Sequence, residues 1–220
     1  GGLAKDEREA VRLYKLAAEQ GDPDAQFHLG ELYENGRGGL TKDEWEAARL
    51  YKLAADQGMP EAQFNLAVFY GLGRGGLAKD EREAARLDKL AADQGFARAQ
   101  YNLGADYEYG FGGLAKDDWE AARLYKLAAD QGMPEAQFSL GVFYENGRGG
   151  LAKDERETAR LYKLAADQGV AFAQNNLGVF YENGRGGLAK DEGEAARLYR
   201  LSAQQGNELA KQNLARLGIR

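Results

Sequence analysis

Two aspartates, Asp88 and Asp106, are the residues of this sequence whose type and setting could support chemistry. Each stands at a core-like position of a repeated pattern, where the other copies carry Tyr for the first and Leu or Phe for the second. Two carboxyl groups held together in an apolar setting can act as an acid–base pair with raised pKa values. They could equally reach solvent or pair with Arg86 or Arg98. A hydrolase using Asp88 and Asp106 is therefore a remote alternative, and a locally weakened segment is the simpler interpretation.

The sequence offers few other chemical groups. His28 is the only histidine and there are no cysteines, which argues against a Ser-His-Asp triad, a multi-histidine metal site, disulfides and thiol catalysis. The glycine-rich segment 37–39 lacks the Lys-Ser/Thr of a phosphate-binding loop. We expect no metal, no cofactor and no catalytic residue. A net charge of −6 and a pI near 5.1 argue against nucleic acid as a partner.

The whole chain is built from one repeated stretch. A Gly-Gly-Leu sequence recurs every 37 residues, with its leucine at Leu3, Leu40, Leu77, Leu114, Leu151 and Leu188. A fixed period in this range is typical of a repeat array. We therefore expect a single array over residues 1–220, made of copies at 1–37, 38–74, 75–111, 112–148, 149–185 and 186–220.

The first helix of each copy is predicted to begin at an aspartate. Asp6 and Glu9 have the spacing of a capping box, in which each side chain satisfies backbone N–H groups at the helix start. The same aspartate recurs at Asp43, Asp80, Asp117, Asp154 and Asp191. Ala10, Leu13, Tyr14 and Ala17 then form one apolar stripe, and the helix is expected to stop at Gly21.

The second helix follows almost at once. Pro23, Pro60 and Pro134 suit a first helical position, and Asn35-Gly36 is expected to end the helix. Gly30 would let a neighbouring helix approach closely. Neither helix can bury its stripe alone, so successive hairpins must stack. The predicted fold class is all-α, a right-handed α/α superhelical solenoid of twelve helices, two in each of six helix-hairpin copies.

The two ends of the array differ. The last helix, expected over residues 207–220, is polar, whereas the first helix keeps the apolar stripe of an interior copy. We expect this stripe to fray or to support end-to-end self-association through the N-terminal copy. No apolar run is long enough to cross a bilayer and no signal peptide is visible, so the chain is read as a soluble, trimmed or mature fragment without membrane insertion and of unknown compartment.

Three segments resemble a known family. Residues 62–70 (AQFNLAVFY) and 136–144 (AQFSLGVFY) resemble the first helix of a Sel1-like repeat, and residues 47–58 (AARLYKLAADQG) are similar to its second helix. The Gly-Arg-Gly-Gly loop is similar to the extended loop that distinguishes this family from tetratricopeptide repeats. The resemblance covers the chain, which in the family's phase opens with an isolated second helix. It implies a bacterial or eukaryotic adaptor that binds other proteins, and repeats that are not enzymes.

Differences between copies indicate where a partner would bind. They gather on one face of the second helix, and the resemblance places that helix on the concave side of the array. Glu34, Glu108, Glu145 and Glu182 would add acid to this groove. A protein or peptide segment with apolar anchors and some Lys or Arg is the expected ligand. The candidate ligand-binding residues are Phe27, Glu31, Phe64, Val68, Arg98, Tyr101, Phe138, Val142, Phe172, Asn175 and Val179.

Two other interpretations remain open. Varying residues on a solvated helix face can reflect neutral drift, and the aromatic rings could pack between neighbouring helices instead of facing a ligand. The close similarity of the copies also fits a purely structural or engineered scaffold without a native ligand. The leading hypothesis is a non-catalytic protein–protein interaction adaptor that binds a peptide or protein segment in its concave groove.

Overall fold

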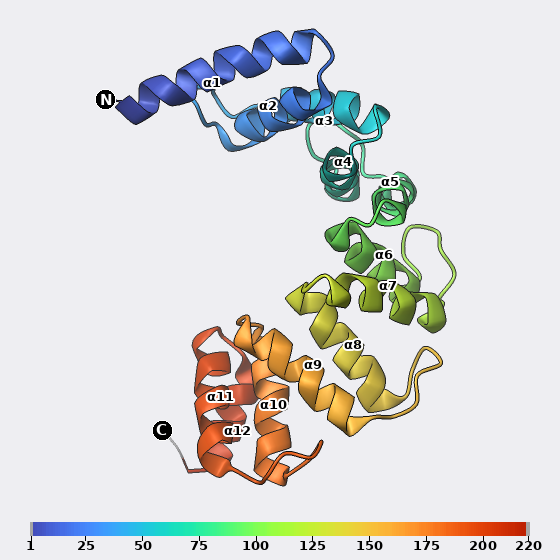
Figure 1. The fold of residues 1–220 in the computed structure, drawn as a ribbon, viewed down its shortest axis with the longest axis vertical. Coiled ribbons are helices and arrows are strands. Elements are labelled where there is room, and N and C mark those ends of the chain that lie inside the picture. The colour runs from blue at the N-terminus through green and yellow to red at the C-terminus, as the bar shows by residue number, and fades with distance from the viewer. Residues whose placement is uncertain (1, 219–220) are drawn as a thin grey trace. The chain divides into compact units, whose positions relative to one another are not determined.

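The chain folds as an all-α solenoid (Figure 1). The computed structural model describes residues 2–218, and their side chains from residue 6 onward. No strand occurs in that range, and the twelve predicted helices are confirmed. They are α1 (Gly2–Glu19), α2 (Pro23–Asn35), α3 (Glu44–Asp56), α4 (Pro60–Leu72), α5 (Glu81–Asp93), α6 (Ala97–Tyr109), α7 (Asp118–Asp130), α8 (Pro134–Asn146), α9 (Glu155–Asp167), α10 (Ala171–Asn183), α11 (Glu192–Gln204) and α12 (Glu208–Arg216).

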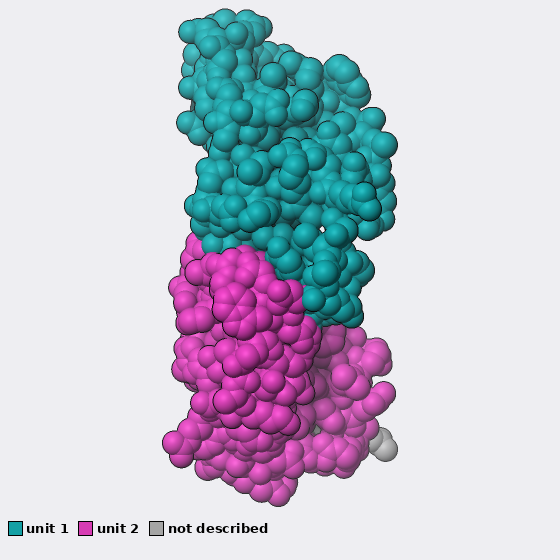
Figure 2. All heavy atoms as spheres, turned by 90° about the vertical axis from the view of Figure 1, so that its right-hand side faces the viewer, with its two compact units in different colours: residues 1–116 teal, residues 117–220 magenta. Residues whose placement is uncertain are grey.

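The helices fall into two compact units, which Figure 2 colours separately. Unit 1 comprises residues 1–116 with α1 to α6, and unit 2 comprises residues 117–220 with α7 to α12. Within each unit, every helix packs against the helices before and after it in sequence. No helix of the described chain is both long and apolar enough to cross a membrane.

The odd-numbered helices from α3 onward begin at the predicted aspartates. The Asp43 carboxylate accepts a hydrogen bond from the backbone N–H of Glu46 at 3.0 Å. The other half of the predicted capping box is wrong, because Glu46 forms an ion pair with Arg49 at 2.6 Å instead. The backbone N–H of Asp43 is already satisfied by the carbonyl of Tyr33, at 2.9 Å. The preceding helix thus replaces the glutamate as the partner of the cap residue.

Helix α1 differs from the prediction at its start. It begins at Gly2, and Asp6 lies exposed within it. In the next copy, the segment before the helix forms a turn, with a hydrogen bond from the Leu40 N–H to the Arg37 carbonyl, and the Asp43 N–H bonds to Tyr33 of the helix ahead. The structure describes no helix ahead of α1, so the equivalent segment continues the helix.

The outer side of α1 is uncovered, as its sequence predicts. Leu13 is 52% exposed, whereas the equivalent Leu50 of the next copy is 2% exposed because α1 and α2 cover it. Self-association through this stripe stays a prediction. At the other end, the predicted helix over residues 207–220 is shorter: Asn207 is its N-cap and the helix ends at Arg216, while residues 219–220 lie outside the described range.

The predicted start and end signals of the even-numbered helices before α12 are confirmed. Pro23, Pro60 and Pro134 are first helical residues. Gly36 has φ of 63°, a left-handed conformation that suits glycine, and its N–H bonds back to the last turn of α2. Within the units, the even helices α2, α4, α8 and α10 pack more extensively on the odd helix that follows than on the one before, for example α2 on α3 and α10 on α11. The tightest hairpin therefore joins the second helix of one copy to the first helix of the next.

A buried tyrosine explains this tight contact. Tyr162 of α9 is fully buried and lies flat on Gly141 of α8, where an added Cβ would come within 2.8 Å of the ring. Gly30 under Tyr51 and Gly178 under Tyr199 repeat the arrangement. The predicted close approach at Gly30 is confirmed. Any larger residue here would have to displace a ring with no free space around it.

Buried glutamines join the copies at the other end of the hairpin. Gln63 donates from its Nε2 to the carbonyl of Ala55, at the end of α3, and its Oε1 accepts from Gln94, at the end of α5. The pattern recurs at Gln26, Gln137 and Gln174. Each glutamine satisfies a helix-terminal carbonyl and ties three successive helices together.

We predict that Gly141→Ala destabilises the protein. The gain in helix propensity, about 1 kcal/mol, is outweighed by crowding of the immobile Tyr162 ring, which costs about 1–3 kcal/mol and more if the ring loses its hydrogen bond. Urea unfolding followed by circular dichroism measures the change. The matched control is Gly71→Ala, because a Cβ at Gly71 meets nothing closer than 3.9 Å. The control should be neutral or stabilising; equal stabilisation by both variants would contradict the close packing.

Candidate functional site

A hydrogen-bonded cluster surrounds the buried tyrosine in a regular copy. The Tyr162 hydroxyl donates to Glu145 of α8 at 2.6 Å, and its ring meets Phe180 of α10 edge to face, with ring centres 5.7 Å apart. Arg185 lies over the Phe180 ring at 4.2 Å and pairs with Glu145 and Glu155 at 3.2 and 2.7 Å. We call this set the tyrosine cluster. Its members in unit 1 are Tyr51, Glu34, Phe69, Arg74 and Glu44.

Around α5, residues of the second and third copies replace this cluster. Tyr becomes Asp88, its hydroxyl partner Glu becomes Gly71, the edge-to-face Phe becomes Asp106, and the Arg becomes Phe111. The glycine beneath the ring becomes Ala67, which the small Asp88 side chain permits. Only the acid equivalent to Glu155 is kept, as Glu81. The five replacements thus concern residues that contact one another in the regular copies.

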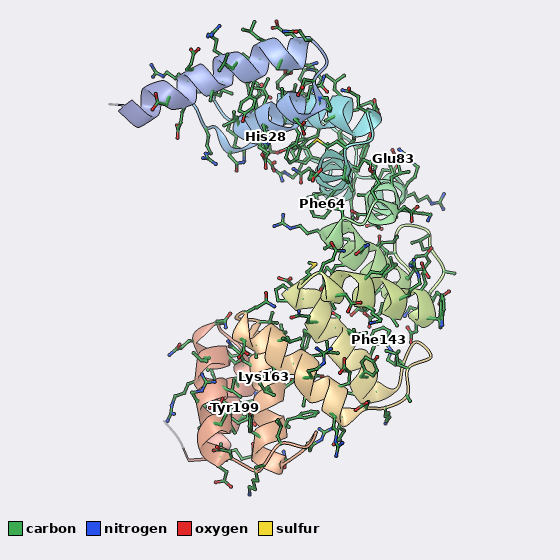
Figure 3. All side chains as sticks on the ribbon, viewed as in Figure 1. His28, Phe64, Glu83, Phe143, Lys163 and Tyr199 are labelled. Atoms are coloured by element: carbon green, nitrogen blue, oxygen red, sulfur yellow. The ribbon has the colours of Figure 1, made fainter. Side chains whose placement is uncertain are left out.

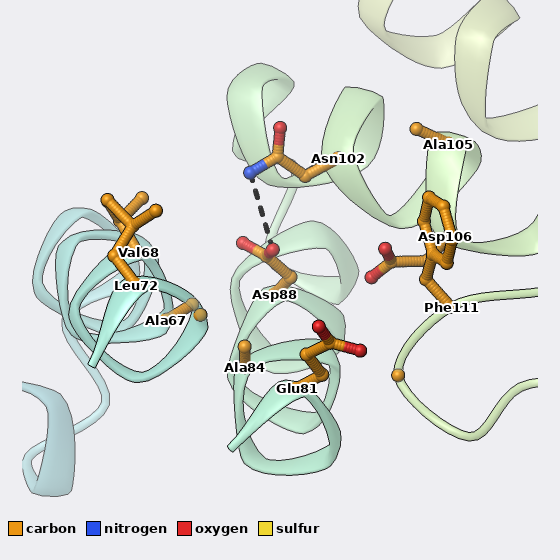
Figure 4. A pocket seen from close by; sticks show the side chains of 12 residues that line it. Ala67, Val68, Leu72, Glu81, Ala84, Asp88, Asn102, Ala105, Asp106 and Phe111 are labelled. Carbon is orange, nitrogen blue, oxygen red and sulfur yellow. Dashed lines mark hydrogen bonds between the residues drawn. The ribbon is translucent and has the colours of Figure 1, made fainter. Parts of the chain in front are cut away.

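The missing tyrosine leaves a pocket of about 440 Å³ within unit 1. Its walls come from α4, α5, α6 and the loop after α6. Figure 4 shows Asp88 between Ala67 and Val68 of α4 on one side and Asp106 and Phe111 on the other, with Asn102 of α6 above it. The lining residues are Ala67, Val68, Gly71, Leu72, Glu81, Ala84, Asp88, Asn102, Ala105, Asp106, Phe111 and Gly112.

Asp88 is a buried acid, and the residues that line the pocket include no cationic side chain that could pair with it. It is 5% exposed, and its Oδ2 accepts a long hydrogen bond of 3.4 Å from the Asn102 side chain. Its Oδ1 is enclosed and accepts no hydrogen bond. Burial raises the pKa of Asp88 to about 8, and the Asp106 carboxylate adds a smaller upward effect. Of the alternatives that the sequence left open, a pairing with Arg86 is not found, because Arg86 pairs with Glu83 at 2.7 Å.

Asp106 lies in the same pocket and is half-buried. Burial raises the pKa of Asp106 to about 6, and the nearby Glu81 contributes in the same direction. Glu81 itself pairs with Lys79 at 2.6 Å on the surface side. The pocket therefore collects three acids, of which the deepest is held neutral near pH 7.

The rim of the pocket is apolar and exposed. Leu72 and Phe111 replace Asn and Arg of other copies, and both are more than half exposed. Tyr109 lies beside Phe111, with ring centres 5.7 Å apart. An apolar rim above the carboxyl groups of Asp88 and Asp106 suits an organic cation, which would favour their ionised forms. Among the described residues, no group of three or more His, Cys, Asp or Glu is arranged to hold a metal ion.

Two of the predicted groove residues are not available to a ligand. Phe27 is buried against Tyr51, with ring centres 5.8 Å apart. Asn175 is buried and accepts a hydrogen bond from Asn213 at 3.0 Å. Both were predicted from their place on a varying helix face. The structure corrects this, because a tyrosine of the next helix and an asparagine of the last helix cover them.

The predicted acidic line is also corrected. Glu34, Glu145 and Glu182 do not face a groove as free charges, because each accepts a hydrogen bond from a buried tyrosine at 2.6–2.7 Å. Arginines neutralise them from the other side, namely Arg74, Arg185 and Arg216. These glutamates are part of the tyrosine clusters.

Several predicted residues do lie near the surface. The Phe64 ring (Figure 3) contacts the Phe96 ring, with ring centres 5.4 Å apart. In other copies a tyrosine covers the equivalent ring, but here that tyrosine is replaced by Asp88. Phe138 stacks on Tyr162 at 5.6 Å and on Phe172 at 6.2 Å, and Phe172 is 59% exposed. Arg98 is exposed. The other predicted residues are partly exposed: Glu31, Val68, Tyr101, Val142 and Val179.

We predict a pH-dependent stabilisation by Asp88→Asn. The folded state raises the pKa of Asp88 from 3.8 to about 8, so the wild type loses stability relative to the variant as the pH rises between these values. The difference should be small near pH 4 and reach a few kcal/mol near pH 9, as an order of magnitude. Urea unfolding at each pH measures it. Asp93→Asn, an exposed change on the same helix, is the control, and identical profiles for all three proteins would contradict the assignment.

The comparisons with known proteins agree with this architecture. The Sel1 repeat family model matches residues 1–22, 23–59, 60–96, 97–133, 134–170 and 171–207. Each complete match spans an even-numbered helix and the odd-numbered helix that follows, and for the matches that lie within one unit this pair is the tight hairpin of the structure. Repeats of this family are generally protein-interaction modules. A comparison with curated protein sequences gave no significant match.

Solved structures give the same result. The protective antigen c5321 of uropathogenic Escherichia coli, which displays an SLR fold, is 35% identical with a TM-score of 0.83 over 96% of this chain and 44% of its own. A Sel1 repeat protein from Oxalobacter formigenes is 34% identical with a TM-score of 0.81 over 94% and 58%. This chain thus spans about half the length of both. Immunity protein PA5088 from Pseudomonas aeruginosa shares the fold. It is 24% identical, with a TM-score of 0.59 over 90% of this chain and 74% of its own. With six matches to the family model along its length, this chain belongs to the Sel1 repeat family.

Proposed function

We propose that this chain is a non-catalytic adaptor that binds a segment of another protein across the exposed face of its even-numbered helices. Family membership supports a role in protein interaction. The odd-numbered helices carry the buried tyrosines and alanines that hold the array together. The even-numbered helices carry most of the differences between copies, and these differences include exposed aromatic and aliphatic side chains.

The exposed ring of Phe172 is the observation that carries the proposal. The equivalent positions in the first four copies hold the charged residues Asp24, Glu61, Arg98 and Glu135, and the sixth copy holds Leu209, which is also exposed. Phe138 stacks beneath it and fixes its orientation. Rigid aromatic pairs of this kind provide large contact areas at low entropic cost, which is typical of interface anchors.

The proposed surface is defined by the predicted residues that the structure leaves accessible. In unit 1 these are Glu31, Phe64, Val68, Arg98 and Tyr101, and in unit 2 they are Phe138, Val142, Phe172 and Val179. A segment with apolar side chains at regular intervals fits the aromatic and valine positions. The net charge of −6 favours a segment that also carries Lys or Arg.

A hydrolase based on Asp88 and Asp106 is a weaker candidate. Both carboxyls line one pocket, and the pKa of each is raised. The lining residues include no Ser, Thr, His, Lys or Arg that could act as a nucleophile or stabilise an oxyanion. We therefore assign the pocket no reaction.

We predict that Phe172→Ala weakens binding of selected peptides. A phage-displayed library of random peptides is panned on the folded chain, and individual peptides are measured by fluorescence polarisation. The enriched sequences should combine aromatic or aliphatic anchors with basic residues. Loss of the Phe172 ring should weaken their binding by roughly 5- to 100-fold, the range of an interface anchor of about 1–3 kcal/mol.

The control for this experiment is Leu164→Ala, which removes a partly exposed apolar side chain from an odd-numbered helix. It should leave peptide binding unchanged, and both variants should keep the helical circular dichroism signal. A library that yields no sequence preference would favour the alternative of a structural scaffold without a native ligand. Equal weakening by Leu164→Ala would argue against the assigned face.

A further inference from the structure

We propose that the pocket around Asp88 binds the side chain of an arginine that a partner protein supplies. The pocket lies outside the aromatic surface of unit 2 and uses different side chains. The inference depends on the proposed function only for the carrier of the arginine, which is a protein segment. The recognition of the guanidinium rests on the residues of the third copy alone.

The chain itself shows how this fold holds an arginine at the equivalent place. In the fifth copy, the Arg185 guanidinium lies 4.2 Å over the Phe180 ring and bridges Glu145 and Glu155. Arg74 does the same over Phe69 between Glu34 and Glu44, and together with Lys42 it lowers the pKa of Glu44 to about 2. The third copy lacks its arginine because Phe111 occupies that position, yet the acid Glu81 is retained.

The empty place has the groups that an arginine needs. Asp88 lines the pocket, and its Oδ1 is enclosed and accepts no hydrogen bond. Leaving such an atom unsatisfied costs free energy that a donor from outside would recover. Asp106 lines the same cavity, and Phe111 presents a ring at the mouth. Ala67, Ala84 and Ala105 make the wall smooth and apolar, which suits the methylene stem of a long side chain.

Arginine fits these groups better than lysine. Its planar guanidinium carries five N–H donors and can serve two carboxylates and the Asn102 carbonyl while its face stacks on a ring. A lysine ammonium is a compact, strongly hydrated charge, so it gains less binding free energy from an aromatic rim and a partly desolvated pocket. The exposed Leu72 and Phe111 at the rim would contact the residues next to the arginine, which is why we assign it to a protein segment.

Binding should depend on pH through the acids of the pocket. Asp88 faces Asn102 and Asp106 of α6, Glu81 lies near the start of its own helix, and α4 contributes only Ala67, Val68, Gly71 and Leu72. A guanidinium favours the ionised carboxylates, so its arrival releases protons from Asp88 and Asp106. Affinity should therefore rise as the pH increases from about 6 to about 8, the pKa values of the two acids.

The test uses N-acetyl-arginine amide as the probe and nuclear magnetic resonance of the whole chain as the readout. Shifts of the Asn102 side-chain amide and the Val68 methyl groups report occupancy. N-acetyl-citrulline amide, which has the same shape without the charge, and N-acetyl-lysine amide are the comparison probes. We expect saturable shifts with the arginine probe, at least several-fold weaker binding of the lysine probe, and no saturation with citrulline.

Two variants make the test specific. Asp88→Asn should keep the fold and weaken arginine binding by roughly 10-fold or more, the usual effect of removing one charged hydrogen-bond partner. The combined variant Ala67→Gly, Gly71→Glu, Asp88→Tyr, Asp106→Phe and Phe111→Arg rebuilds the regular tyrosine cluster. It should be more thermostable than the wild type and should not bind the probe.

Three results would overturn the inference: equal binding of the arginine and citrulline probes, lysine binding as tight as arginine binding, or unchanged arginine binding in Asp88→Asn. Phe172→Ala separates the two proposals, because it should leave binding of the arginine probe unaltered while it weakens the selected peptides. If the arginine probe binds and no peptide does, the adaptor surface fails and the pocket stands. If peptides bind and the probe does not, the reverse holds.

Discussion

The hydrogen bond from a buried tyrosine to a glutamate of the preceding helix is the interaction on which the stacking of this array depends. Tyr51, Tyr162 and Tyr199 each fill the space between one even-numbered helix and the next even-numbered helix. The ring requires a glycine beneath it, the hydroxyl requires the glutamate, and the glutamate requires an arginine to balance its charge. Since a buried polar group is costly without partners, these residues are useful only as a set.

The helices themselves were predictable because their signals are local. An aspartate cap, a proline at the first position and a glycine at the end each act within one turn, and the 37-residue period repeats the same signals six times. The two errors in the helix starts have one cause. The N–H of Asp43 bonds to Tyr33, which lies in the preceding helix, and this partner is absent for Asp6. A hydrogen bond between two helices thus determines where the helix starts, although the sequence signal for the start is local.

The exposed face was predicted less well, because helical periodicity assigns residues to a face but does not say what covers it. Phe27 and Phe64 are equivalent in sequence, yet Phe27 is buried against Tyr51 and Phe64 contacts Phe96. The difference arises 24 positions later, where Tyr51 has Asp88 as its counterpart. A signal for this did exist in the sequence. Positions 67 and 71 of the second copy and positions 88, 106 and 111 of the third depart from the pattern, and their equivalents contact one another elsewhere.

A linear array can tolerate the residues that replace the tyrosine cluster around Asp88, because of how it distributes stability. Each copy contacts only its neighbours, so a weakened joint lowers the stability of that joint and leaves the more distant ones intact. A globular core would lose far more from an aspartate in place of a buried tyrosine. The pocket around Asp88 is therefore a cavity that this architecture can tolerate, with an acid that no residue of the chain neutralises among the groups lining it. A ligand that supplies the missing positive charge would restore the joint and couple its own binding to the rigidity of α4, α5 and α6.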